Sequence, residues 1–491
     1  MSETNRPRIV ILGAGPGGLC IAKKLLDAGQ DKLTILERGN EIGGTWVNNR
    51  YPGLACDVPS FLYSFSFEMK VDWTKTYAMQ PEIKRYVQDC ARKYGIDKYV
   101  RFDTDIISAR WIEDSAVWRL TDRAGNVHEA EIFISALGMF NEVNWPRIDG
   151  LDSFQGEIIH TAHWPEGRDL SGRNVAVVGS AASAVQLIPE VARQAARLTV
   201  FQRTANWVMP KKDADYTEED LEQFRRNPQI AHDARAEQRY QMEIRIAFDN
   251  KPIIADMERQ SLRAQSVVTD AHTREKLRPN VPLGSQRPLY SNDYYPTFNL
   301  PHVRLITGAV TRVGERSVST ATETVEDVDT LILATGYKAN KFLSVIDVYG
   351  RDGLSIHDAW SEGPQAYLGI ATSGFPNLFM LYGPNTNNGS IMTMLEYQSD
   401  YIIARLRQML DAGLSWVDIR KSVMDAYNEK LQAEIRAVEP WQAEGSKYYR
   451  AASGRIVTQW PHNMEAYEKA VAVDDFDLYE HSAKQGRLAT A

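Results

Sequence analysis

Short apolar runs that lead directly into turns rich in small residues are the clearest pattern in this chain. The run at 8–12 (RIVIL) is apolar without alternation, which predicts a strand buried on both faces of a parallel sheet. The turn at 13–18 (GAGPGG) follows at once, and the residues after it have helical spacing as far as Gly29. Strand, glycine turn and helix in this order predict a βαβ unit that binds a dinucleotide.

Three glycines of this turn have separate physical tasks. Gly13 permits the tight turn, Gly15 lets the backbone approach a pyrophosphate, and Gly18 lets the helix pack closely on the strand. The next apolar run, LTILE, ends in Glu37, a position from which a carboxylate accepts hydrogen bonds from a ribose hydroxyl. The glycine pattern therefore gains support from the residues that follow it.

A second unit with the same design begins at residue 174. An apolar run at 174–178 (NVAVV) leads into the turn GSAASA and then into another helix. We expect this turn to contact a dinucleotide through Gly179, Ser180, Ala181 and Ser183. Ala181 replaces the middle glycine, and its methyl group takes space where the backbone would approach the pyrophosphate, so this second motif is the weaker one.

The strands that follow the two turns can be compared position by position. The segment 33–38 (LTILER) corresponds to 198–203 (LTVFQR), so that Gln202 stands in place of Glu37. A carboxylate at this position would repel a ribose 2′-phosphate, whereas an amide does not. The second unit is therefore predicted to favour NADPH over NADH, with the phosphate bound by residues from this group: Arg203, Thr204, Lys211 and Lys212.

Two dinucleotide units in one chain predict an oxidoreductase with one resident carrier and one that delivers hydride. The run 132–138 (IFISALG) is echoed at 330–336 (TLILATG), and we interpret the second copy as the return of the chain to the first domain. The predicted fold is α/β, with two Rossmann-like domains, the NADPH domain inserted into the FAD domain, and a helical subdomain. The expected boundaries are 1–148 for the first part of the FAD domain, 149–325 for the NADPH domain including a polar helical region at 213–277, and 326–491 for the second part of the FAD domain.

Composition narrows the class of protein. With 491 residues, 43% hydrophobic, the chain can bury a large core, and its net charge of −8 argues against a nucleic acid partner. Cys20, Cys56 and Cys90 show no CxxC pair and no metal-ligand spacing, so no metal is expected and a reducing cytoplasm fits best. No secretory signal and no run of about 20 apolar residues is present, so we expect no integral membrane association.

The segment between the two units resembles a known family fingerprint. Residues 154–165 (FQGEIIHTAHWP) agree at all five defined positions with the FxGxxxHxxxW(P/D) sequence of the Baeyer-Villiger monooxygenases, class B flavoproteins related to the flavin-containing monooxygenases. Trp164 followed by Pro165 is similar to the enzymes that oxidise ketones, since the relatives that oxidise heteroatoms usually have Tyr or Phe. The resemblance extends over nearly the whole chain, through GGTW (43–46), RYPG (50–53), CD (56–57), QRT (202–204), DYY (293–295), ATGY (334–337) and GPN (383–385).

This resemblance implies a chemistry and a set of residues. Such an enzyme uses FAD, NADPH and O2 to insert one oxygen atom beside the carbonyl of a ketone through a C4a-peroxyflavin, giving an ester or lactone. The resemblance gives His160 a conformational role and places the aromatic segment 441–460 over the cofactors as part of the substrate wall. Besides the two turns, it adds these cofactor-binding residues: Gly44, Thr45, Trp46, Asp57, Tyr63, Ile106, Thr335 and Gly336.

Arg287 falls on the active-site arginine of the family. A guanidinium keeps its proton near neutral pH, so it can stabilise an oxygen anion, and Asp57 would orient it through a carboxylate pair. The family commonly has lysine before this arginine, and here Gln286 replaces it, so Arg203 would carry more of the contact with the 2′-phosphate.

Two other functions remain open, and a third is excluded. An N- or S-oxygenating flavin monooxygenase is the nearest alternative, and Trp164 and Arg287 argue against it. A scaffold protein that has lost NADPH affinity through Ala181 and Gln286 is a more distant one. A flavin disulfide reductase would need a redox-active cysteine pair, which the sequence lacks.

Overall fold

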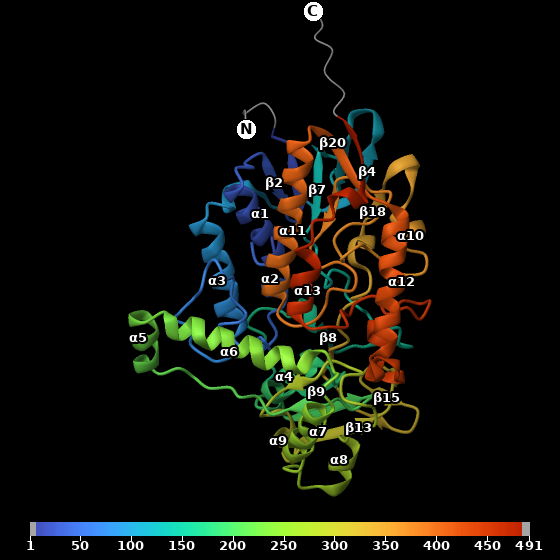
Figure 1. Ribbon diagram of the computed structural model, residues 1–491. Helices are drawn as coiled ribbons and strands as arrows, with labels where there is room; N and C mark the ends of the chain where they lie inside the picture. Colours follow the sequence, from blue (N-terminus) through green and yellow to red (C-terminus); the bar gives the residue numbers. More distant parts are fainter. Residues whose placement is uncertain (1–5, 484–491) are drawn as a thin grey trace, which may run out of the picture.

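Two parallel sheets of five strands each form the centre of the protein, whose computed structural model describes residues 6–483 (Figure 1). Every strand of the first sheet runs parallel to its neighbours. Its spatial order is β19 (Leu378–Met380), β7 (Ile132–Ser135), β1 (Ile9–Leu12), β2 (Leu33–Leu36) and β3 (Val100–Arg101). All four residues of β1 are buried, as expected for a strand covered on both faces.

The second sheet repeats this arrangement. In space its order is β13 (Val303–Thr307), β10 (Arg197–Gln202), β9 (Asn174–Val178), β17 (Thr330–Leu333) and β8 (Glu157–His160), again all parallel. In each sheet the first strand of its βαβ unit, β1 or β9, has its next strand on one side and a later strand on the other. The turn after it therefore lies at a topological switch point, where α/β sheets bind ligands.

One prediction about the chain path is wrong. The run at 330–336 was expected to return the chain to the first sheet, yet β17 pairs with β9 and β8 in the second. Each copy of the repeated run is the strand beside the central one, β7 beside β1 and β17 beside β9. The two similar runs therefore occupy equivalent positions in two different sheets. The chain returns to the first sheet and the elements around it later, with β18 (Asp347–Tyr349) and β19.

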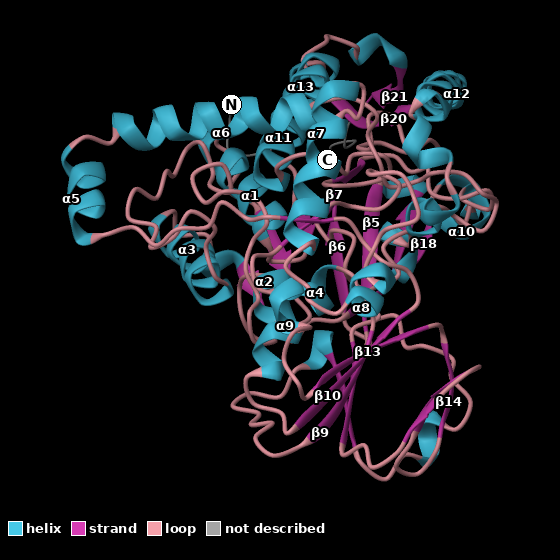
Figure 2. Cartoon of the chain, turned by 90° about the horizontal axis from the view of Figure 1, so that it is seen from below, coloured by secondary structure: helices cyan, strands magenta, loops and turns pink. Residues whose placement is uncertain are grey.

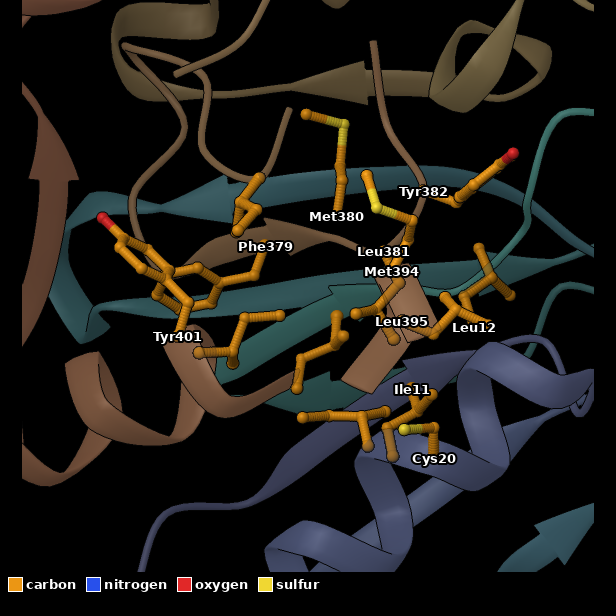
Figure 3. Packing of buried hydrophobic residues seen from close by; sticks show 14 of the residues in the cluster. Ile11, Leu12, Cys20, Phe379, Met380, Leu381, Tyr382, Met394, Leu395 and Tyr401 are labelled. Atoms are coloured by element: carbon orange, nitrogen blue, oxygen red, sulfur yellow. The ribbon is translucent and has the colours of Figure 1, made fainter. Parts of the chain in front are cut away.

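Helices α1 (Pro16–Asp27) and α11 (Ile391–Asp411) pack against each other over the first sheet. α1 starts with proline at its first position and is followed by Gly29 at φ +76, which agrees with the predicted end. Figure 3 shows Ile11 of β1 near Cys20 of α1, with Leu395 of α11 beside them. This packing holds the first turn rigidly at the end of β1.

The first sheet and the elements packed around it form what we call the first body. Its other elements come from the parts of the sequence before and after the second sheet. They include the sheet of β18, β4 (Ile106–Ile112), β5 (Val117–Asp122) and β6 (Val127–Ala130), helix α3 (Gln80–Lys93), the pair β20 (Leu414–Ile419) and β21 (Tyr479–Ala483), and helices α12 (Lys421–Ala437) and α13 (Met464–Val471). Among residues 6–483, no helix is both long and apolar enough to cross a membrane.

The polar region at 213–277 is helical, as predicted, but it is not surrounded by solvent. It contains α5 (Glu218–Arg226), α6 (Gln229–Ile246), α7 (Lys251–Gln265) and α8 (Ala271–Lys276). α6 reaches from the outlying α5 to the middle of the molecule (Figures 1 and 2). Its Arg235 donates hydrogen bonds to the carbonyl oxygens of Phe61 (2.8 Å) and Ser64 (2.7 Å), which joins the inserted segment to the first body.

His160 ends β8 in a buried hydrogen-bonded chain. Its Nδ1 accepts from the backbone N–H of Ala162 (3.0 Å), so the proton of the neutral ring is on Nε2, which donates to Thr335 Oγ1 (3.1 Å). Thr335 in turn donates to the carbonyl oxygen of Asn144 (2.7 Å). Burial, with a contribution from His163, lowers the pKa of His160 to about 4. The ring is thus a neutral connector between two linking segments.

This burial makes stability depend on pH. Because the folded-state pKa of His160 lies below the unfolded value of 6.5, its contribution is complete above pH 6.5 and is lost as the pH falls towards about 4. The expected loss is about 3 kcal/mol in the free energy of unfolding. Urea unfolding of wild type and His160→Gln between pH 7 and 4 measures it, and the variant should show a shallower pH slope. His232→Gln, on the exposed side of α6, is the control; equal slopes for all three proteins would contradict the prediction.

Candidate active site

A cavity lies at the carboxyl end of β1, at the first glycine turn. Its wall includes the loop with Leu137 and Gly138 and, from the far side, Tyr382. Six of the residues predicted from sequence line it: Gly13, Gly15, Glu37, Gly44, Thr45 and Ile106.

The backbone of the turn fits a phosphate group. Gly13 has φ +107, and a Cβ atom there would lie 2.9 Å from the carbonyl oxygen of Ala136, so no other residue fits. A Cβ atom on Gly18 would overlap the carbonyl oxygen of Gly13, which confirms its role in close helix packing. At Gly15 the nearest atom would be the Cα of Gly44 at 3.5 Å, so this glycine leaves open space in the cavity rather than relieving a clash. The N-terminus of α1 faces that space with its free N–H groups.

Glu37 is fixed at the mouth of the cavity by the backbone. Its Oε2 accepts from the N–H of Ala14 (2.8 Å) and its Oε1 from the N–H of Gly39 (2.7 Å). Each carboxylate oxygen can accept a second hydrogen bond, so the side chain can still bind a ribose hydroxyl. The residues present therefore fit the adenosine and pyrophosphate parts of a flavin dinucleotide.

Outside the lining of this cavity lie Gly18, Trp46, Asp57 and Tyr63, which the sequence also predicts to bind a cofactor. Gly18 is buried beneath the turn, and Trp46 donates from Nε1 to the hydroxyl of Tyr63 (3.0 Å) with the two rings edge to face. Both aromatic side chains are buried. Trp46 and Tyr63 thus form a rigid support behind Gly44 and Thr45.

The second turn has the same backbone design as the first, with Ala181 in place of the middle glycine. Gly179 has φ +128, and a Cβ atom there would lie 2.5 Å from the carbonyl oxygen of Ala334. Ser180 donates from its hydroxyl to the carbonyl oxygen of Thr204 (2.9 Å), which closes the turn over the next strand. Ala181 is the exposed residue before α4 (Ala182–Ala192), and Ser183 lies in the first turn of that helix.

The four candidates for binding a 2′-phosphate are not equivalent. Arg203 is exposed beyond the end of β10, with Thr204 next to it, and no carboxylate in the described part of the chain lies within 4.0 Å of its guanidinium. Lys212 is exposed too. Lys211, in contrast, has its Nζ 3.8 Å from Asp213 Oδ2 and 4.7 Å from the ring centroid of Tyr77, so its charge is already matched.

Gln202 does not face a ribose either. Its side chain is buried, and Nε2 donates to the carbonyl oxygen of Lys276 (2.8 Å), which fixes α8 against β10. The absence of a carboxylate at this position still removes repulsion of a phosphate. Among the four candidates, the exposed cations are Arg203 and Lys212. Thr335 and Gly336 lie after β17, Thr335 within the hydrogen-bonded chain of His160 and Gly336 at φ +71.

Arg287, from the inserted segment, forms an ion pair with Asp57, from the first body. Arg287 Nη2 donates to Asp57 Oδ1 at 2.7 Å, and the carboxylate of Asp57 raises the pKa of Arg287 above its already high value. The guanidinium therefore carries its charge at every pH at which the protein is folded. Its side chain is half exposed, which leaves donors on the fork for a ligand.

Both partners are placed by contacts of their own segments. Tyr51 donates to Gln186 Oε1 of α4 (3.1 Å), and Gln186 Nε2 donates to the carbonyl oxygen of Ala55 (2.9 Å), two residues before Asp57. On the other side, Gly284 has φ +95 and lies directly against the ring of Phe248. The backbone, more than the ion pair, sets where the two charges meet.

Two tyrosines, Tyr382 and Tyr448, lie near this ion pair, and the sequence predicted only the segment that contains Tyr448. Tyr382 lines the cavity and donates to Asn387 Oδ1; burial raises its pKa, and Arg287 opposes the rise. Tyr448, from the predicted covering segment, also feels the charge of Arg287. Tyr382 directly precedes the GPN motif, which was a signal for it in the sequence. The described residues hold no group of three or more His, Cys, Asp or Glu side chains suited to a metal ion.

Comparisons with known proteins show the family of the chain. Residues 6–347 match the family model described as flavin-binding monooxygenase-like. A Baeyer-Villiger monooxygenase from Pseudomonas aeruginosa is 37% identical over 462 residues, covering 92% of this chain and 87% of that protein.

Solved structures show the same architecture. A closed crystal structure of cyclohexanone monooxygenase superposes with a TM-score of 0.87 at 26% identity, covering 98% of this chain and 99% of the other. A structure of OTEMO in complex with FAD and NADP gives a TM-score of 0.87 at 28% identity, covering 97% and 99%. The chain therefore belongs to the flavin-binding monooxygenase-like family and, within it, to the Baeyer-Villiger monooxygenases.

Proposed function

We propose that this protein is an FAD- and NADPH-dependent monooxygenase that inserts one oxygen atom of O2 beside the carbonyl of a ketone, giving an ester or a lactone. The observation that carries the proposal is the ion pair of Arg287 and Asp57 at 2.7 Å, next to a cavity suited to a flavin. Names of relatives support it, among them the Pseudomonas aeruginosa Baeyer-Villiger monooxygenase and an ε-caprolactone-bound cyclohexanone monooxygenase.

The cavity at the first turn would hold FAD. Gly13 and Gly15 leave room for the pyrophosphate, Glu37 binds the ribose, and Gly44 and Thr45 line the opposite wall. NADPH would bind along the second turn with its 2′-phosphate at Arg203 and Thr204. When bound, FAD and NADPH would supply the hydride-transfer and oxygen-transfer chemistry.

Arg287 and Asp57 supply the electrostatics of the reaction. Negative charge develops on oxygen while the carbonyl is attacked, and a fixed guanidinium stabilises it without reorganising in the transition state. Asp57 holds the planar fork in one orientation, which keeps its remaining donors aimed at the reacting atoms. The buried ring of Tyr382 would restrict water on the cavity side of the site.

A pair of substrates separates this function from the nearest alternative. The purified protein should be yellow, should lose its colour anaerobically with NADPH, and should convert a cyclic ketone to its lactone. A thioether is supplied in parallel. Oxidation of the sulfur alone, with the ketone recovered unchanged, would show an N- or S-oxygenating enzyme, and a colourless protein unable to bind FAD would leave only a scaffold function.

Replacement of Arg287 should separate reduction from oxygen transfer. In Arg287→Ala, anaerobic flavin reduction by NADPH should stay within about tenfold of wild type, whereas ketone oxygenation should fall at least 100-fold, as expected on removal of one fixed donor to a developing anion. Stopped-flow absorbance and product analysis give the two rates. Arg119→Ala, which breaks a surface pair with Glu129, serves as the control. Lactone formation by Arg287→Ala at the wild-type rate would disprove the assigned role.

Replacement of Arg203 should change coenzyme preference. In Arg203→Gln, the loss of a charge-assisted hydrogen bond to the 2′-phosphate should raise KM for NADPH about tenfold or more and leave KM for NADH nearly unchanged. Steady-state kinetics with both coenzymes measure the ratio. Lys211→Gln is the informative comparison, because its charge is held by Asp213, and it should shift the ratio less. A larger shift in Lys211→Gln would place the phosphate elsewhere.

A further inference from the structure

The end of α6 is fixed beside the ion pair of Arg287 and Asp57. The carbonyl oxygen of Ile246, the last residue of α6, accepts from Asn388 Nδ2 (3.1 Å), in the loop that also contains the partner of Tyr382. Two residues further on, Phe248 lies directly against Gly284, in the segment that carries Arg287. Arg245 therefore stands on a rigid element between two walls of the site (Figures 1 and 2 show the course of α6).

Arg245 has a charge that the protein does not match. Its Nη2 donates to the amide oxygen of Gln241 (3.1 Å), and no carboxylate oxygen within residues 6–483 lies within 4.0 Å of its guanidinium. Its neighbours on α6 are satisfied in other ways. Arg239 pairs with Glu468 at 2.8 Å, and Arg235 binds backbone carbonyl groups.

The nearby charges are already paired with one another. Arg287 forms an ion pair with Asp57 (2.7 Å between nitrogen and oxygen). Asp213 lies between the Nζ atoms of Lys211 (3.8 Å) and Lys75 (3.7 Å). Arg245 is half-buried and remains as the surplus positive charge of this region. A half-buried guanidinium without an anion loses hydration that nothing in the protein restores, so it is suited to an anionic ligand.

Two tyrosines lie close to the end of α6. Tyr290 packs in the same apolar cluster as Phe248, and the ring centroid of Tyr77 is 4.7 Å from Lys211 Nζ. Burial raises the pKa of Tyr77 to about 12, Arg245 opposes this rise, and Asp57 adds to it. Burial likewise raises the pKa of Tyr290, again with Asp57 and Arg245 acting in opposite directions. Because burial raises both pKa values, both phenols keep their protons and can donate a hydrogen bond. In the part of the chain that is described, neither hydroxyl group is engaged in a hydrogen bond with the protein.

We propose that Arg245, with the hydroxyl groups of Tyr77 and Tyr290, binds a carboxylate carried by the ketone, so that the preferred substrates are keto acids. The planar fork of Arg245 can hold a carboxylate through two parallel hydrogen bonds, and two phenols can donate to its remaining lone pairs. Arg245 is then a specificity-determining residue, separate from Arg287 at the reacting carbonyl. This inference rests on the proposed function for its ketone and not for its anion site.

The first test compares two ketones that differ in one group. A neutral linear methyl ketone and the same ketone with a terminal carboxylate are turned over by the holoenzyme, and kcat/KM is measured for each. Wild type should favour the keto acid, and Arg245→Gln should reduce that preference about 10- to 100-fold. Arg259→Gln on α7, whose partner is Asp256 at 3.0 Å, is the matched control and should keep the wild-type preference. Arg245→Lys should retain part of it.

The second test needs no turnover. Octanoate, which carries the anion and no ketone, is titrated into oxidised holoenzyme, and its Kd is read from the flavin absorbance spectrum. The Kd should rise about tenfold or more in Arg245→Gln, with an unchanged thermal unfolding midpoint. Arg245-dependent octanoate binding without oxygenation of either ketone would refute the proposed function and leave the anion site standing.

Three results would overturn the inference. The first is an equal loss of kcat/KM for both ketones in Arg245→Gln, and the second is wild-type preference for the neutral ketone. The third is a raised KM for NADPH in Arg245→Gln with unchanged discrimination between the ketones, which would assign Arg245 to the coenzyme phosphates.

Discussion

The site depends on holding the permanently charged guanidinium of Arg287 opposite the carboxylate of Asp57. Arg287 lies in the inserted segment and Asp57 lies in the first body, and their ion pair spans 2.7 Å. A partly exposed ion pair contributes little stability by itself, so it cannot draw the bodies together. Contacts of Tyr51 and Ala55 with α4, and of Arg235 with the carbonyl oxygens of Phe61 and Ser64, do this instead. Much of the fold around the site can be understood as support for these two short segments.

Local patterns made the two dinucleotide units predictable. Uniform burial, sharp turns and helix starts depend on residues close in sequence, so the runs at 8–12 and 174–178 predicted β1 and β9 almost to the residue. The sheet in which a strand pairs depends on distant partners. Nothing within the run at 330–336 distinguishes the first sheet from the second, and only the complete fold assigns it to the second.

The site residues show the same contrast between what local sequence predicts and what distant contacts decide. Family motifs identified Arg287 and Asp57, which the structure brings into contact. They gave no information on side-chain direction: Lys211 turned towards Asp213, and Gln202 towards the carbonyl oxygen of Lys276. Arg245 gave no signal, because it belongs to a polar helical sequence of the kind usually found facing solvent. Its position beside the site depends on how the end of α6 packs.

The interleaved path of the chain also orders its synthesis. The second sheet has all its strands once residue 333 has left the ribosome, so it can close as a unit. The first sheet starts earlier yet keeps one edge of β7 open until β19, at 378–380, has been made. An unpaired apolar edge is a template for aggregation. Nascent protein should therefore be most vulnerable while the inserted segment is being translated, and chaperones that shield strand edges should matter most in that interval.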